Sequence, residues 1–119
     1  MGPFLKNRLK SIHYAARGAL ILLRTEASIK VQLAIAIAVT VAGFYFNISA
    51  LEWAIQIITI ALVMSIEGVN TAIEKMADFI HPDHHHKIGT IKDISAGAVF
   101  IAAVMAVIVG GIIYIPKIF

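Results

Sequence analysis

Four polar residues within one apolar stretch have a spacing that would let them act together. Glu67, Asn70, Glu74 and Asp78 follow one another at intervals of three and four residues. At about 100° per residue, this spacing puts all four on one stripe of a helix. An ionisable group at the centre of a bilayer costs about 2.5–3.5 kcal/mol on the mildest scale, so Glu67 indicates function. Such carboxylates could accept a proton from a substrate hydroxyl or bind a divalent cation, since magnesium prefers oxygen ligands.

The distribution of charge predicts the elements that carry this stripe. Of the 119 residues, 60% are hydrophobic and 14% are charged, against about 25% charged in a typical soluble domain. Residues 31–51 and 94–116 carry no charged side chain, and residues 53–73 carry only Glu67. About 20 apolar residues cross the hydrocarbon core as a helix. We therefore predict an all-α membrane protein, a single membrane domain over residues 1–119, with transmembrane helices within residues 29–49, 52–80 and 93–115.

Residues 4–25 differ in kind from these three segments. Apolar and basic side chains recur there on two separate stripes at helical spacing, which is typical of a helix lying in the membrane interface. Most of the cations are expected to anchor this helix to the membrane, and some could face a nucleotide or a lipid head group. The apolar stripe is Leu5, Leu9, Ile12, Ala16, Leu20 and Leu23, and the basic stripe is Lys6, Lys10, His13, Arg17 and Arg24.

Lysines and arginines predict the orientation of the chain in the membrane. Six lie in residues 1–30 and three in residues 75–92, whereas the turn at residues 47–52 has none. Since cytoplasmic loops are rich in these residues, the N-terminus and the second loop should face the cytoplasm. Glu26 and the pair Lys92–Asp93 would then lie at the cytoplasmic side with Glu74. The expected aromatic belt at the outer interface is Phe44, Tyr45, Phe46, Trp53 and Tyr114.

Two further features concern assembly and metal binding. Ala98, Ala102, Ala106 and Gly110 repeat every four residues, a pattern that lets membrane helices approach closely. Three helices cannot enclose a polar site alone, so we expect a cyclic homo-oligomer with sites between subunits.

Four histidines, at positions 81 and 84–86, lie on a predicted loop opened by Pro82. They are expected on a loop and not on one helix, as a helical zinc site requires, which favours a solvated loop that touches a nucleotide over a transition-metal site. The absence of cysteine excludes a thiolate zinc site and a cysteine nucleophile.

The run from Glu67 to Asp78, EGVNTAIEKMAD, resembles the signature of the small bacterial diacylglycerol kinase family, which includes undecaprenol kinases. In that signature a glutamate is followed by Asn at the third position after it, Glu at the seventh and Asp at the eleventh. Ala77 stands where the family usually has Val or Ile. The resemblance covers nearly the whole chain, because Tyr14, Gly18, Thr25–Glu26 and Lys92–Asp93 also match.

The resemblance implies a homotrimer in the bacterial inner membrane that phosphorylates a lipid alcohol with MgATP. Glu67 would be the general base, and Glu26 and Glu74 would ligate Mg²⁺ together with the nucleotide phosphates. The family's N-terminal arginine aligns with Asn7, and Arg8 follows it. The positions that match nucleotide contacts are Tyr14, Glu26, Glu74, Asp83, His84, His85, Lys92 and Asp93. Those expected to bind the lipid or support the site are Arg8, Arg17, Asn70, Asp78 and Ala96.

Other functions and two substrates remain open at this point. A proton- or cation-coupled carrier could use Glu67 as its titrating group. A non-catalytic pore-forming or assembly protein is disfavoured, because a pore needs only an amphipathic face and this stripe puts Asn70 between two glutamates. Diacylglycerol and undecaprenol both offer a primary hydroxyl near the head-group plane. Thr25–Glu26 and Pro82–Asp83 look closer to the undecaprenol-preferring branch of the family.

Overall fold

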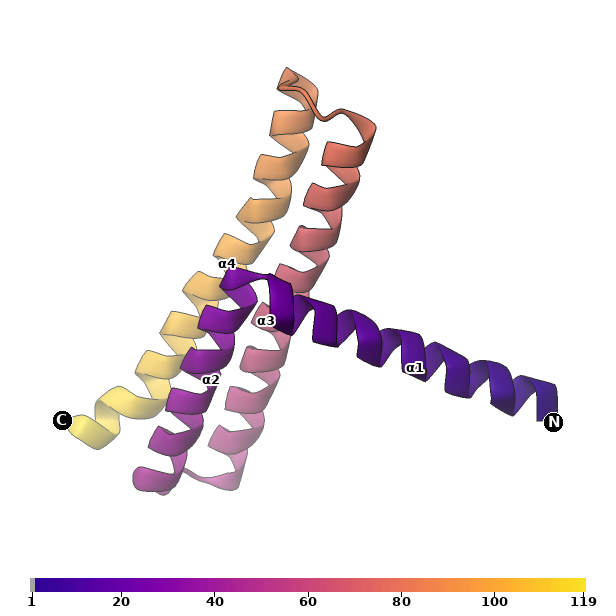
Figure 1. The fold of residues 1–119 in the computed structure, drawn as a ribbon. Helices are drawn as coiled ribbons and strands as arrows, with labels where there is room; N and C mark the ends of the chain where they lie inside the picture. Colours follow the sequence, from indigo (N-terminus) through magenta and orange to yellow (C-terminus); the bar gives the residue numbers. More distant parts are fainter. Residues whose placement is uncertain (1) are drawn as a thin grey trace.

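A computed structural model describes residues 2–119, which form four helices joined by short connections (Figure 1). The helices are α1 (Gly2–Thr25), α2 (Ala27–Tyr45), α3 (Ala50–Ile80) and α4 (His86–Ile118). By length and composition, α2, α3 and α4 are each apolar enough to cross a membrane. The predicted fold class, an amphipathic helix followed by three apolar helices, is confirmed.

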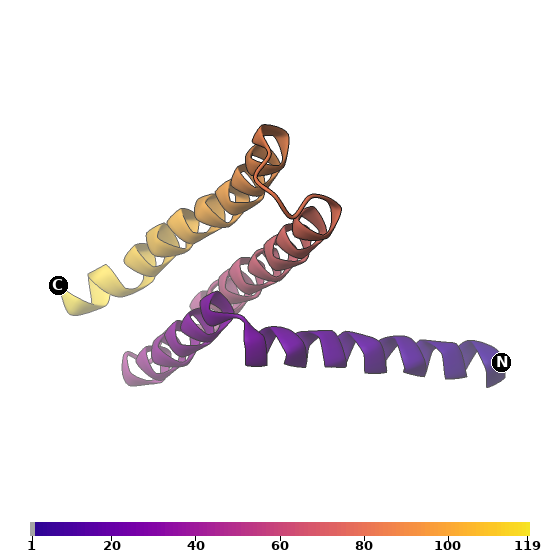
Figure 2. The same cartoon turned by 45° about the horizontal axis from the view of Figure 1, so that its top comes forward.

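Helices α3 and α4 form a long antiparallel hairpin, and α2 covers the half of it that contains the start of α3 and the end of α4 (Figure 1). Helix α1 extends away from this bundle in both views (Figures 1 and 2). Few side chains are buried, and large apolar residues are exposed on every helix. Within the small-residue stripe, Ala102 is buried whereas Ala98 is exposed. A single chain therefore leaves much apolar surface for lipid or for other copies.

The turn between α2 and α3 is defined by its own residues. Helix α2 ends at Tyr45, and Asn47 then adopts a φ of 51°, a left-handed conformation that Asn tolerates better than most residues. Ser49 starts α3 with a capping box: its hydroxyl accepts from the Glu52 N–H at 3.1 Å, and its own N–H donates to Glu52 Oε1 at 2.9 Å. The sharp turn puts α2 and α3 antiparallel and next to each other.

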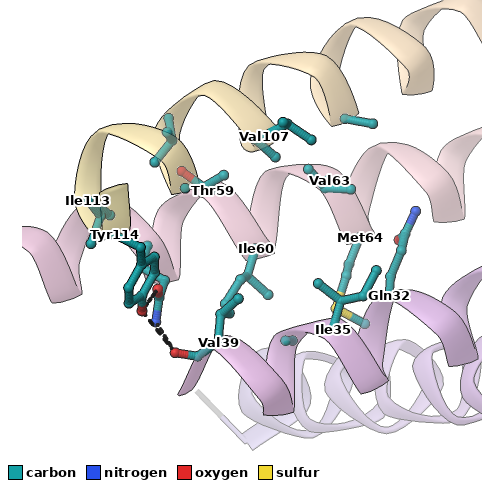
Figure 3. Close-up of a pocket in the computed structure, with 16 residues that line it drawn as sticks. Gln32, Ile35, Val39, Thr59, Ile60, Val63, Met64, Val107, Ile113 and Tyr114 are labelled. Carbon is teal, nitrogen blue, oxygen red and sulfur yellow. Dashed lines mark hydrogen bonds between the residues drawn. The ribbon is translucent and has the colours of Figure 1, made fainter. Parts of the chain in front are cut away.

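Polar groups at this end of the bundle join three helices. The Gln56 amide donates to the Val39 carbonyl oxygen at 3.1 Å, and the Tyr114 hydroxyl lies 3.0 Å from the same oxygen and 2.5 Å from Gln56 Oε1 (Figure 3). Lys117 pairs with Glu52 at 3.0 Å. Aromatic rings surround this cluster, with centroids 4.9 Å apart for Phe44 and Trp53 and 5.9 Å apart for Phe46 and Tyr114. These contacts hold the ends of α2 and α4 against the start of α3.

Candidate active site

The predicted stripe on α3 changes from buried to exposed along the helix. Glu67 and Asn70 are buried, with 8% and 7% of their surface exposed, whereas Glu74 and Asp78 are exposed. Thr71, beside Asn70, is also buried. A stripe with this gradient offers one carboxylate shielded from water and two that a water-soluble ligand could reach.

Glu67 has no cation to neutralise it within residues 2–119. The ion pairs in this part of the chain are formed by other acids, namely Glu26 with Lys75, Asp78 with Lys92, and Glu52 with Lys117. Burying a carboxylate without a partner is unfavourable, and natural proteins retain such a group where it has a chemical role. Glu67 is therefore a candidate for a chemical role in this site.

Asn70 connects the buried and exposed parts of the stripe. Its Nδ2 donates to Glu74 Oε1 at 3.2 Å, one helical turn away. Its Oδ1 is buried and has no hydrogen-bond partner. A buried acceptor without a donor costs about 1–3 kcal/mol, which a bound cation or donor would recover. The amide thus both orients Glu74 and presents a free oxygen next to it.

Glu26, which precedes α2, contacts α3 beside the stripe. It is the N-cap residue of α2, yet its side chain makes no capping hydrogen bond. Instead its Oε1 lies 3.7 Å from Nζ of Lys75, the residue that follows Glu74 on α3. The sequence predicts Lys75 only as one of the cations that orient the chain, whereas its contact with Glu26 depends on how α2 packs against α3.

An ion pair between Asp78 and Lys92 joins the C-terminal end of α3 to the N-terminal end of α4. Beyond it, the histidine cluster forms the connection between the helices. The His81 and His85 rings lie 5.0 Å apart, and His85 Nδ1 accepts from the Lys87 N–H at 3.1 Å. His86 was expected in the loop but is the first residue of α4, because His85 caps the helix at this point.

The described residues contain no group of three or more His, Asp or Glu side chains close enough to hold a metal ion. In the described part of the chain, several other predicted site residues form no hydrogen bond or ion pair with the stripe. These are exposed residues of α1, which points away from the bundle, and exposed residues of the α3–α4 connection and early α4. The first group is Arg8, Tyr14 and Arg17, and the second is Asp83, His84, His85, Asp93 and Ala96.

An apolar cleft of about 480 Å³ runs between α2, α3 and α4 (Figure 3). On α3 it is lined by Ile60, Val63 and Met64, and Glu67 follows Val63 by one turn on the same face of the helix. Polar side chains in the cleft are few, and Gln32 Oε1 is buried there without a partner. An apolar space therefore begins one helical turn from the acidic stripe.

The fold and the stripe together describe a small helical membrane protein with a buried carboxylate beside exposed ones. The family model described as prokaryotic diacylglycerol kinase matches residues 13–114. An undecaprenol kinase of Bacillus subtilis is 39% identical over 95% of this chain and 92% of its own length. Diacylglycerol kinases of Synechocystis and of Escherichia coli K12 are 35% and 32% identical, over 92% and 84% of this chain and 63% and 82% of their own lengths.

The chain belongs to the prokaryotic diacylglycerol kinase family. It is a membrane-embedded lipid kinase, an enzyme whose phosphoryl donor is ATP. The resemblance carried by residues 67–78 is confirmed, and the match gives no support to the carrier hypothesis.

Proposed function

We propose that this protein transfers the γ-phosphoryl group of MgATP to the hydroxyl of a lipid alcohol, with Glu67 as general base. The observation that carries this proposal is a buried glutamate, 8% exposed and without a cation, on the face of α3 that leads into the apolar cleft. In the step itself, the lipid oxygen bonds to the γ-phosphorus and the bond to the bridging oxygen of ADP breaks. The hydroxyl proton passes to the Glu67 carboxylate.

Glu74 and Glu26 are the residues that would hold magnesium. Their carboxylate oxygens are the ligands this ion prefers, and it commonly uses one or two carboxylates together with substrate phosphates. The buried, unpartnered Oδ1 of Asn70 next to Glu74 supports a cation or donor at this place. The bound ion would neutralise negative charge on the phosphates during transfer.

Undecaprenol is the substrate we favour over diacylglycerol. The relative at 39% identity is named an undecaprenol kinase, and those at 35% and 32% are named diacylglycerol kinases. Thr25–Glu26 and Pro82–Asp83 also resemble the undecaprenol-preferring branch. The cleft between α2, α3 and α4, which is lined by Val63 one turn before Glu67, is an apolar space that the hydrocarbon part of either lipid could enter.

The catalytic unit we propose is a homotrimer in the bacterial inner membrane, with its N-terminus in the cytoplasm. Exposed apolar side chains on all three spanning helices leave faces for other copies to cover. Helix α1 would lie along the inner interface, where Arg8 and Arg17 face lipid phosphates and Tyr14 reaches nucleotide. Because α1 leaves its own bundle, these side chains support sites shared between subunits.

A competition assay tests this function. The purified protein receives ATP labelled at the γ-phosphate, Mg²⁺, and mixed micelles with equal amounts of undecaprenol and diacylglycerol. We expect label chiefly in undecaprenyl phosphate, and none after chelation of Mg²⁺. Label chiefly in phosphatidic acid would overturn the substrate assignment, and no label in either lipid would overturn the proposed function.

A further inference from the structure

Helix α1 approaches α3 where the Leu22 side chain faces the backbone of Gly68. Every residue of Gly2–Thr25 is exposed except Leu22, which is half-buried. A methyl group built on Gly68 would lie 3.0 Å from Leu22 Cδ1. Carbon atoms in ordinary contact lie about 3.5–4.0 Å apart. A side chain at position 68 would therefore press on Leu22 Cδ1, so Leu22 or α1 would have to shift to make room for it.

A second contact lies on the same side of α3. Glu26 meets Lys75 at 3.7 Å, and Lys75 follows Gly68 by seven residues, or about two turns. Leu22 and Glu26 are themselves linked, since the Glu26 N–H donates to the Leu22 carbonyl oxygen at 3.1 Å. The junction of α1 and α2 thus contacts α3 at two residues, Gly68 and Lys75. Glu67 directly precedes Gly68, and Glu74 directly precedes Lys75.

We infer that Gly68 and Leu22 are positioning residues, whose contact sets the direction in which α1 leaves the bundle beside Glu67. This inference rests on the proposed function, in which α1 carries Arg8, Tyr14 and Arg17 to the lipid and the nucleotide. Tyr14 lies eight residues from Leu22, about 12 Å along the helix, so a small rotation at Leu22 is enlarged at Tyr14. A displacement of about 1 Å in a group that positions substrate can cost about 100-fold in rate.

An exchange of side-chain size tests the contact. Gly68→Val adds three carbons at the contact, and Leu22→Ala removes three. We expect Gly68→Val to lower kcat/KM about tenfold or more, mainly through higher KM values for the lipid and MgATP, because Glu67 is untouched. Adding Leu22→Ala should restore kcat/KM to within about threefold of the parent. Gly97→Val is the matched control, since a Cβ there meets nothing within 4 Å.

A distance measurement separates this inference from the kinase function. The chain has no cysteine, so nitroxide labels attach only at Ser11→Cys on α1 and Phe79→Cys on α3, both exposed positions. In labelled protein diluted with unlabelled protein, Gly68→Val should shift the distance between the labels, and Leu22→Ala should reverse the shift. If Gly68→Val yields no folded protein, Gly68→Ala should cause the same changes to a smaller degree.

Each outcome bears on one of the two claims. If the parent protein phosphorylates neither lipid, the proposed function is overturned. The contact is still supported in that case if Gly68→Val shifts the label distance and Leu22→Ala reverses the shift. If the parent is active, the inference is overturned when Gly68→Val and Gly68→Ala both keep the parent's distance between the labels and its KM values for the lipid and MgATP. A defect that Leu22→Ala does not repair would overturn it as well.

Discussion

The Asn70 side chain donates a hydrogen bond to Glu74 Oε1 at 3.2 Å while its own Oδ1 stays buried without a partner. In the proposed site, this amide holds the Glu74 carboxylate in place. Loss of a group that orients a metal ligand typically costs about 10- to 100-fold in metal affinity or activity. In this proposal, Asn70 would act on magnesium through Glu74.

Replacing Asn70 tests this role. We expect Asn70→Ala to lower kcat/KM by about 10- to 100-fold and to raise the magnesium concentration at half-maximal rate, because Glu74 loses its orienting donor. The measurement is the initial rate of lipid phosphorylation over a magnesium titration. Val69→Ala is the control, since Val69 is 59% exposed on another side of α3. An Asn70→Ala enzyme with the magnesium curve of the parent would contradict the role.

Helical periodicity was sufficient to predict the polar stripe on α3. It could not predict which residues of the other helices contact α3 beside that stripe. Spacing alone puts Glu67, Asn70, Glu74 and Asp78 on one face, because the α-helix has a fixed geometry. The pairing of Lys75 with Glu26 depends on how α2 is rotated and how far it is shifted along α3, which no local pattern encodes. The same holds for the approach of Leu22 to Gly68.

Gln56 is a buried polar residue in the apolar part of α3. It is 5% exposed and bonds to α2 and α4 at the end of the bundle opposite the ion pair of Asp78 and Lys92. A polar residue in an apolar span, 11 residues before Glu67, lies on the same stripe. That spacing was enough to predict that Gln56 faces the interior, whereas its partners Val39 and Tyr114 required the fold.

The Lys75–Glu26 ion pair predicts an opposite effect of two substitutions on the magnesium requirement. Glu26→Gln removes a ligand charge and should raise the magnesium concentration at half-maximal rate about tenfold. Lys75→Met removes an ammonium group that repels the divalent cation. It should lower that concentration by about two- to threefold, a small effect because Lys75 is exposed to solvent. Magnesium titrations of both variants check the signs, and an unchanged or lowered magnesium requirement in Glu26→Gln would rule out Glu26 as a ligand.

Gly43 predicts a stability effect far from the stripe. A Cβ at this position would lie 2.6 Å from Cη2 of the Trp53 ring and 3.1 Å from Cδ1 of Ile48. The backbone of α2 thus packs directly on Trp53, and Gly43→Ala should destabilise the protein by about 1–3 kcal/mol through overpacking. The measurement is the loss of helical circular dichroism on heating in detergent.

Gly97→Ala is the control for this effect, because nothing lies within 4 Å of a Cβ there. It should leave the melting temperature unchanged or raise it, since alanine favours a helix over glycine by about 1 kcal/mol. Equal melting temperatures for Gly43→Ala and the parent would mean that Trp53 does not pack on Gly43 in the membrane protein.

The turnover of Glu67→Gln tests the central claim most directly. Glutamine keeps the size of the side chain but cannot accept the lipid proton, so kcat should fall by about 10²- to 10⁴-fold with the oligomer intact. Glu52→Gln changes a glutamate at the opposite end of α3 and should keep the kcat of the parent. A Glu67→Gln enzyme with the kcat of the parent would contradict the claim that this carboxylate deprotonates the lipid hydroxyl.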